Sequence, residues 1–267
     1  MTIVIIHGLL IALFLAVGAR YPRSQGRPLT RDTFINLTNG LMLASLRFLF
    51  ATALALSAAT AAVHPRCDLS GVRGLALQLL VAFLLSDLTR YTLHYLHHRI
   101  DLLWRFHAVH HSTTRLDATA GLRMHLVDFI QLSLVPVVLF GFLFDASTFD
   151  PRVWPALIVI TDAFDAFQHA DIALRLDHPL AAAWDRLFNN PVFHSWHHST
   201  HPGEYNGNYG QGLTIWDRLF GTHIARIEGA PETGLPPAEC LDESVWGLQL
   251  LRPAVSGPSS PPFLPPS

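Results

Sequence analysis

The stretch DLTRYTLHYLHHRIDLLWRFHAVHHS, residues 87–112, follows a long apolar run and contains six of the chain's histidines. It repeats one pattern, His-x-x-His-His, at 94–98 and 107–111, and the same pattern returns at 194–198 in FHSWHH. Each residue of an α-helix turns by about 100°, so the histidines of one repeat lie on one helix face. The sequence therefore predicts helices that each present a row of imidazoles.

The composition indicates a membrane protein. Half of the 267 residues are hydrophobic and 14% are charged, and the mean hydropathy is +0.31. These values are too apolar for an ordinary soluble protein of this length. The net charge of −2 gives no indication of nucleic-acid binding. We therefore expect an all-α fold, a polytopic membrane helical bundle with a His-rich cap.

Five apolar segments predict spanning helices: 2–18, a segment within 35–62, 73–96, 126–144 and 153–169. The first could be a signal peptide, but basic residues follow it rather than precede it, which favours a retained helix. Pro136 predicts a kink in the fourth segment. We expect a single membrane-embedded domain over 1–250 and a Pro- and Ser-rich disordered tail over 251–267.

The arginines predict the orientation in the membrane. Four of them, Arg20, Arg23, Arg27 and Arg31, follow the first apolar segment. Since Lys and Arg are enriched in cytoplasmic loops, this loop is expected in the cytoplasm. Counting spans from there places 97–125 and everything after 170 on the same side. All three His repeats then lie on the cytoplasmic side, facing inward from the inner membrane if the protein is bacterial.

The three histidine faces indicate a metal centre. Neutral imidazole is a common metal ligand, and pairs at i, i+3 or i+4 can chelate one ion. Three such faces offer more ligands than one metal accepts, so the cap is expected to hold a dinuclear metal site. All-nitrogen ligands fit iron or zinc better than magnesium or calcium. Isolated histidines (His7, His64, His178, His223) are more simply explained as surface or core residues.

These motifs resemble those of the fatty acid hydroxylase and sterol desaturase superfamily of membrane di-iron oxygenases. Residues 87–112 are similar to its first two histidine boxes, and FHSWHHS at 193–199, NYG at 208–210 and WDRLFGT at 216–222 are similar to its third box and C-terminal signature. The resemblance implies eight metal ligands: His94, His98, His107, His110, His111, His194, His197 and His198. It also implies that no catalytic residue is separate from the metal ligands.

Five further residues are candidates for additional ligands or for partners of the ligands. His97 shares the face of the first box but falls outside the family pattern, and His169 lies in QHADI, which resembles a segment that supplies an extra histidine in the family. His125 ends an Arg-x-His sequence that Pro usually follows in the family, whereas Leu126 follows it here. Asp165 is placed to orient His169. Asp87 shares the face of His94, but an ion pair with Arg90 explains it equally well.

The resemblance implies an enzyme, a monooxygenase-type oxidoreductase that uses two iron ions (Fe2+/Fe3+) and O2 to hydroxylate or desaturate a lipid. The sequence contains no recognisable flavin or nicotinamide domain, so an external electron-donor protein is expected. Two alternatives come from other classes. A zinc-dependent membrane hydrolase would usually need a Glu base, and the first Glu of the chain, Glu204, follows all three boxes. A polytopic metal transporter would need ligands at mid-depth in several helices.

Overall fold

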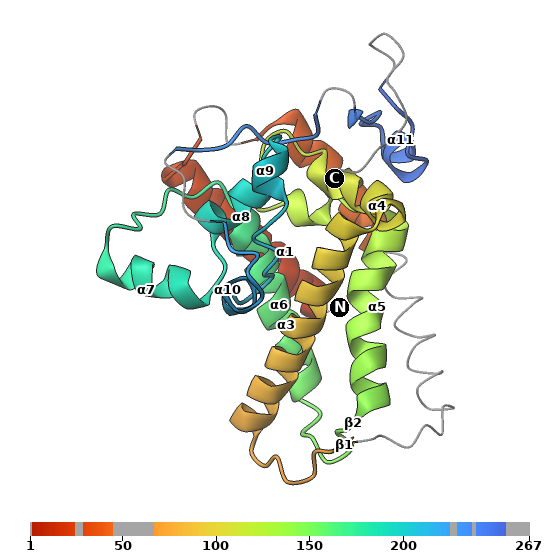
Figure 1. Cartoon of the computed structure of the whole chain (residues 1–267), viewed down its shortest axis with the longest axis vertical. Helices are drawn as coiled ribbons and strands as arrows, with labels where there is room; N and C mark the ends of the chain where they lie inside the picture. The colour runs from red at the N-terminus through yellow and green to blue at the C-terminus, as the bar shows by residue number, and fades with distance from the viewer. Residues whose placement is uncertain (1, 25–28, 45–66, 225–228, 237–238, 255–267) are drawn as a thin grey trace.

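The computed structural model describes residues 2–24, 29–44, 67–224, 229–236 and 239–254. These residues form helices joined by loops, with one two-residue pair of strands, which confirms the predicted all-α class. Long helices extend to the lower end of the molecule, and short helices with long loops lie in the upper part, called the cap below (Figure 1). The predicted tail has residues 255–267 outside the described part.

Four long helices match four of the predicted apolar segments. They are α1 (Thr2–Arg20), α3 (Leu75–Arg99), α5 (Leu126–Leu143) and α6 (Val153–His169). Among the described residues, α1, α3 and α5 are long and apolar enough to cross a membrane. Pro136 lies inside α5, and the helix continues past it to Leu143. The predicted span within 35–62 begins in a helix over 31–44, and its residues 45–62 lie outside the described part.

The lower end of the bundle is closed by two neighbouring connections. Strand β1 (Cys67–Asp68) pairs in parallel with β2 (Phe144–Asp145), so the segment before α3 meets the segment after α5. Both strands lie at the end of the bundle opposite to the cap (Figure 1). Gln78 supports this end, because its side-chain oxygen accepts from the Asp150 amide at 2.9 Å. The arrangement agrees with both connections lying on one side of the membrane.

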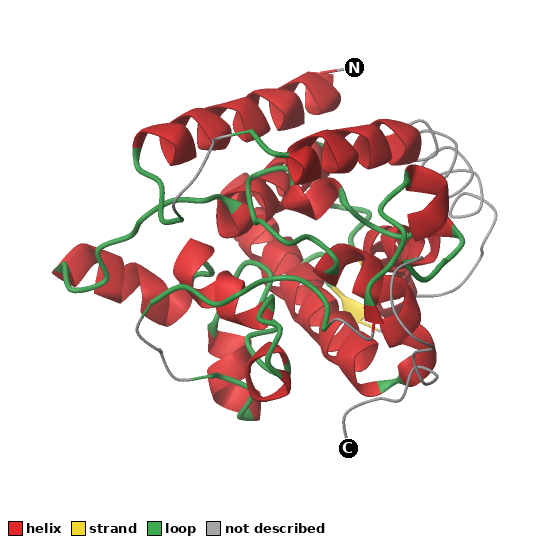
Figure 2. Cartoon of the chain, turned by 90° about the horizontal axis from the view of Figure 1, so that it is seen from above, coloured by secondary structure: helices red, strands yellow, loops and turns green. Residues whose placement is uncertain are grey.

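The cap contains the short elements: α4 (Asp101–His111), η1 (Ala120–Leu122), α7 (Pro179–Leu187), α8 (Pro191–His197), α9 (Pro202–Tyr205), α10 (Ile215–Phe220) and α11 (Val245–Gln249). Seen from above, α1 runs along one edge of the molecule (Figure 2). The C-terminal segment packs on α4 through a cluster that includes Trp104, Tyr205 and Leu248. Residues from both ends of the cap therefore enclose the helix that carries the second His repeat.

A short break between α3 and α4 turns the first two His repeats toward each other. Ile100 has extended backbone angles and is both the C-cap residue of α3 and the N-cap residue of α4. Asp101 begins α4, where a carboxylate interacts favourably with the positive end of the helix dipole. The two helices therefore fold back on each other, and the two histidine faces meet between them.

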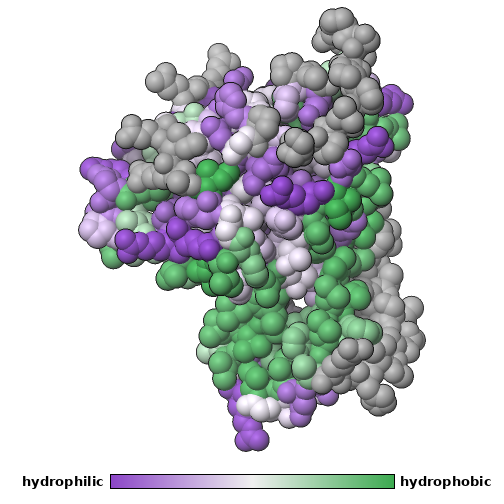
Figure 3. All heavy atoms as spheres, viewed as in Figure 1, coloured by the Kyte–Doolittle hydropathy of each residue, from purple (hydrophilic) through white to green (hydrophobic). Residues whose placement is uncertain are grey.

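The surface divides in the same way as the helices. Figure 3 shows apolar residues over the lower bundle and mostly polar residues over the cap. Exposed large apolar side chains of the lower bundle include Leu77, Leu80, Val137 and Val138. A water-soluble protein would bury such side chains, whereas a membrane protein turns them to lipid. With three apolar helices of spanning length, this surface defines an integral membrane protein.

Candidate metal centre

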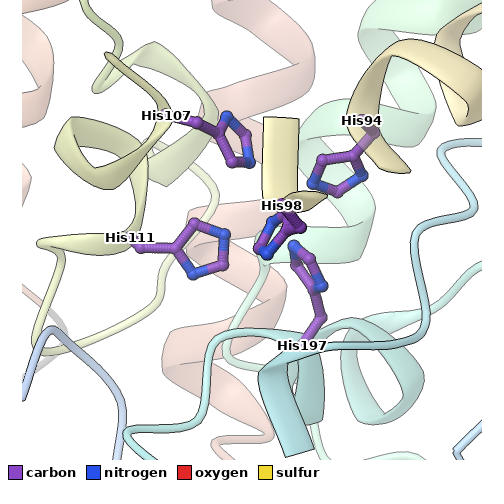
Figure 4. Close-up of side chains that lie close together, drawn as sticks. All are labelled: His94, His98, His107, His111 and His197. Atoms are coloured by element: carbon purple, nitrogen blue, oxygen red, sulfur yellow. The ribbon is translucent and has the colours of Figure 1, made fainter. Parts of the chain in front are cut away.

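Five histidines from three helices converge at the junction of the bundle and the cap. His94 and His98 come from the last turns of α3, His107 and His111 from α4, and His197 from the end of α8. Figure 4 shows their rings turned toward one common point. One ring nitrogen from each lies within 4.8 Å of the corresponding nitrogen of the others. All five residues are buried, so this first group is an enclosed set of ring nitrogens that could bind a metal ion.

A second group of four histidines adjoins the first. It contains His110, His169, His194 and His198, all buried. Their Nε2 atoms form a chain, with 3.2 Å from His110 to His169, 3.0 Å from His169 to His194 and 3.1 Å from His194 to His198. The rings of His111 and His198 stack with centroids 4.4 Å apart, so the two groups share a border. The structure thus brings all eight histidines of the family pattern together and adds His169.

Hydrogen bonds at the Nδ1 side fix how several of these rings are turned. His94 Nδ1 donates to the Tyr209 carbonyl at 2.8 Å, and His197 Nδ1 donates to the Gly207 carbonyl at 2.8 Å. In the same way His107 donates to Asp128, His110 to the Arg123 carbonyl and His169 to the Asp165 carbonyl. A proton on Nδ1 leaves the Nε2 lone pair free, which is the usual state of a metal-bound histidine.

The free nitrogens of the first group have no hydrogen-bond partner among the described residues. Nε2 of His94, His98, His107, His111 and His197 is buried and makes no hydrogen bond. Buried polar atoms without a partner are rare because each costs free energy. In the second group, Nδ1 of His110 and Nδ1 of His169 both donate, so their Nε2 atoms carry free lone pairs that would repel each other at 3.2 Å. Both observations fit metal ions bound between the rings.

Burial also keeps the imidazoles outside the spanning helices neutral. It lowers the pKa of His110 and of His197 to about 3. The pKa values of His107, His111, His194 and His198 are lowered well below the usual value, again mainly by burial. These rings therefore do not become protonated near neutral pH, and a neutral imidazole is the form that binds metal.

His97 belongs to neither of these two groups, but its ring stacks on that of His107 with centroids 5.2 Å apart, and it forms a third possible group with His107 and Asp128. Its Nε2 is 2.8 Å from the Gln131 side-chain oxygen, and its Nδ1 is 3.3 Å from Asp128 Oδ1. The other Asp128 oxygen accepts from His107 Nδ1 at 3.0 Å. His97 is therefore placed as a support for Asp128, which in turn orients His107.

Asp87 has a different partner from those considered in the sequence. Its Oδ1 accepts from the Gly212 amide at 2.8 Å, and its Oδ2 accepts from the Leu213 amide at 3.1 Å and from Trp216 Nε1 at 2.9 Å. None of these partners is a histidine of the two metal groups. Asp87 instead binds the 207–217 segment to α3, and this segment carries the carbonyls that orient His94 and His197.

Asp217, the last residue of this segment, folds the segment back on itself. Its two oxygens accept from the amides of Tyr209 and Gly210, each at 2.7 Å, and Thr222 Oγ1 donates to it at 2.7 Å. The tight turn at this point has Asn208 in the left-handed region, with φ 57°. These contacts explain why NYG and WDRLFGT occur together, since the Asp of one motif folds the backbone of the other.

The remaining two candidates lie near the groups without joining them. The Asp165 carboxylate is 3.6 Å from His169 Nδ1, whereas the backbone carbonyl of Asp165 accepts from it at 2.7 Å. His125 Nδ1 accepts from the Val127 amide at the start of α5, and its Nε2 is 3.0 Å from the Gln249 carbonyl. Both ring nitrogens of His125 are thus used in capping α5 and anchoring α11.

Helix α8 is built to deliver the third His repeat. Asn190 caps it, since its side-chain oxygen accepts from the amides of Val192 and Phe193, and Pro191 occupies the first helical position, where its fixed φ favours a helix start. Asn189 donates to the Gln168 side chain, next to His169 in α6. The Asn189 hydrogen bond thereby ties the start of α8 to the last turn of α6. His194 is thus held next to His169.

Asp128 and Asp217 were not identified in the sequence analysis, although each had a signal. Asp128 is the single charged residue of the apolar segment 126–144, and a charge in such a segment indicates a functional contact. Asp217 lies within a recognised motif, but its role depends on a backbone turn that spacing does not predict. The carbonyl partners of the histidines have no side-chain signal at all.

Comparison with known families assigns the chain to a class. The sequence model of the fatty acid hydroxylase family matches residues 79–222, more than half of the chain. This range begins in α3 and ends just after α10, so it includes all nine histidines of the two groups. The chain belongs to the fatty acid hydroxylase family, which confirms the resemblance. No solved structure matches it significantly.

Individual relatives are lipid-modifying enzymes. The chain is 34% identical over 151 residues to the ornithine lipid hydroxylase OlsE of Rhizobium tropici, covering 55% of this chain and 42% of the relative. It is 30% identical over 150 residues to an alkylglycerol monooxygenase of Xenopus tropicalis, covering 55% of this chain and 31% of the relative. It is 28% identical over 165 residues to the fatty acid hydroxylase vlmA of a Lecanicillium species, covering 59% and 44%. The matched segment therefore spans less than half of each relative.

Proposed function

We propose that the protein is a di-iron oxygenase that inserts an oxygen atom from O2 into an alkyl chain of a membrane lipid. The observation that carries the proposal is the pair of adjoining groups of buried ring nitrogens, five in one and four in the other. Two irons, each bound by nitrogen ligands, would supply the chemistry that activates O2. The first iron would be bound by the first group and the second iron by the second group.

The protein's own residues would bind, orient and seal this centre. Asp128 and the backbone carbonyls at 207 and 209 hold the Nδ1 protons of three ligands, so that the opposite nitrogens point inward. Loss of such partners typically costs about 10–100-fold in metal affinity or activity. Burial of every ligand excludes bulk water, which protects a reactive centre from side reactions.

A lipid substrate is supported by the position of the centre and by the relatives. The two groups lie where apolar helices α3 and α6 enter the cap, so a lipid could reach them from the membrane. The relatives named above act on ornithine lipids, alkylglycerols and fatty acids, which favours hydroxylation over desaturation for this chain. We further propose that the cap faces the cytoplasm and receives electrons from a separate protein there.

The structure favours neither the zinc-dependent hydrolase nor the metal transporter. A zinc hydrolase would need an acid or base beside the metal, yet Glu204 accepts from Ser199 and belongs to neither group. A transporter would need ligands along a path through the membrane. Both groups instead lie together at one end of the bundle.

Two measurements on purified protein test the proposal. Metal analysis should find about two irons per chain, as a two-metal site requires. Under isotopically labelled O2, with a chemical reductant and membrane lipids, mass spectrometry should detect labelled oxygen in a lipid product. A single zinc per chain, or lipid turnover under strict anaerobiosis, would contradict the proposal. Comparison of the lipids of a deletion strain with those of its parent would identify the substrate.

A further inference from the structure

Helix α7 exposes the side of itself that a soluble protein would bury. Leu180, Trp184 and Leu187 are 76%, 42% and 51% exposed. Their spacing of four and three places them on one helix face. None of the described residues of α7 is buried. The helix is therefore amphipathic, and its apolar face remains largely exposed.

Helix α10 continues this apolar surface. Leu219 and Phe220 at its end are both well exposed. The two helices are joined where α7 ends and α10 begins, because the Thr214 amide donates to the Leu187 carbonyl at 3.0 Å and Thr214 Oγ1 donates to the Asp185 carbonyl at 3.1 Å. We call the surface formed by Leu180, Trp184, Leu187, Leu219 and Phe220 the apolar shelf.

The apolar shelf adjoins the helices of the bundle below the cap. The ring of Phe220 stacks on Tyr91 of α3, with centroids 5.5 Å apart. Tyr91 is three residues before His94, the first metal-group histidine of α3, which corresponds to about 4.5 Å along the helix axis. On the other side, Trp184 stacks on Phe164 of α6 with centroids 6.4 Å apart. The shelf therefore lies beside the apolar parts of α3 and α6, at a lower level than the metal groups.

We propose that the apolar shelf is embedded in the boundary between lipid headgroups and acyl chains, and that it seats the cap on the bilayer. A surface helix with an outward apolar face that contains Trp and Leu is typical of this location. Figure 3 shows apolar residues along the lower edge of the part that carries α7, beside the apolar surface of the bundle. Arg186 and Arg218 are exposed next to the shelf residues, where their guanidinium groups reach the headgroup level.

The proposal depends on the membrane location and not on the metal or the reaction. The shelf also brings lipid to a defined depth beside α3 and α6, the two bundle helices whose last turns carry metal-group histidines. Lipid chains that pack against the shelf would thus lie near the level at which a substrate has to enter.

Spin labels test the location. Cys67 and Cys240 are both exposed and free, so they are first changed to Ser. Single cysteines then replace Leu180, Leu187 or Leu219 and carry a nitroxide label in vesicles of phosphatidylcholine and phosphatidylglycerol. Trp246 of α11 gives a matched control, since Trp246 and Leu219 are both 69% exposed. Val137 on α5 is the reference for lipid.

The measurement compares collisions of each label with O2, which concentrates in lipid, and with a water-soluble nickel chelate. Labels at 180, 187 and 219 should collide more with O2 than with nickel, like the label at 137, while the label at 246 should show the opposite ratio. Nickel access at the shelf equal to that at 246 would overturn the proposal. So would dipolar broadening between shelf labels that persists after dilution with unlabelled lipid, because it would show a second copy covering the shelf. An unchanged melting temperature in detergent confirms that each variant is folded.

Discussion

Replacement of Asp217 by Ala is expected to damage the metal centre from a distance. The Asp217 side chain is fully buried and accepts from the amides of Tyr209 and Gly210 and from Thr222 Oγ1. Alanine would leave two backbone N–H groups buried without an acceptor. Each such group costs about 1–3 kcal/mol, so the free energy of unfolding should fall by roughly 2–6 kcal/mol.

The same change should weaken metal binding through His94. The Tyr209 carbonyl accepts from His94 Nδ1 only while the 208–210 turn keeps its shape. When the turn relaxes, His94 loses the partner that fixes its ring, and such losses cost about 10–100-fold in metal affinity or activity. Asp217→Asn keeps one acceptor oxygen and should fall between the wild type and Asp217→Ala.

Iron content, melting temperature in detergent and product formation should be measured together for these variants. Arg218→Ala is the control, because Arg218 is the exposed neighbour of Asp217 and its hydrogen bond to the Asp185 carbonyl is at the surface. The reasoning would be refuted if Asp217→Ala retained iron and activity as well as Arg218→Ala does. A lower melting temperature with unchanged iron affinity would show that Asp217 supports the fold without orienting a ligand.

Three further outcomes are expected. Loss of iron and activity should be severe in His110→Ala and milder in His97→Ala, and equal loss of iron would show that His97 is itself a ligand. Gly121→Ala would bring a Cβ into the Asp165 carboxylate and force that side chain to move, so it should lower the melting temperature, and adding Asp165→Ala should restore part of the loss. Burial lowers the pKa of His110 and of His197 to about 3 in the folded protein. The contribution of these neutral histidines to the free energy of unfolding of the metal-free protein is therefore fully present above pH 6.5, about the pKa of histidine in the unfolded chain. It should decrease as pH falls from there toward 3, by about 1.4 kcal/mol per pH unit for each histidine, which melting at a series of pH values would check.

Local features of the sequence were enough to predict the long helices and the shared faces of the histidines. The apolar runs predicted α1, α3, α5 and α6 within a few residues, because the thickness of a membrane sets the length of the apolar run that a spanning helix needs. The His-x-x-His-His spacing predicted a shared helix face, since that geometry depends only on the helical repeat. His169 was identified through the resemblance, and the structure places it in the second group.

Features that depend on contacts distant in the sequence could not be predicted in the same way. Asp87 was considered beside its helix neighbours His94 and Arg90, but its carboxylate binds a segment more than 120 residues away. Asp165 was expected to orient His169 through its side chain, whereas the backbone carbonyl of the same residue is the closer acceptor. Helical spacing places two residues on one face, and it does not say which atom of a residue makes the contact.

Buried carboxylates in apolar helices connect these observations. Asp87 in α3 and Asp128 in α5 lie in segments otherwise suited to lipid, where an unpaired charge would be costly. Each has partners: Asp128 accepts from His107 and lies 3.3 Å from His97 Nδ1, and Asp87 accepts from the segment that orients His94 and His197. The two carboxylates therefore support the first histidine group in different ways, Asp128 directly and Asp87 through the backbone that it holds. A charged residue inside a predicted span of this family is thus best interpreted together with the histidines at the end of that span, because removing either carboxylate would free a ligand ring to turn.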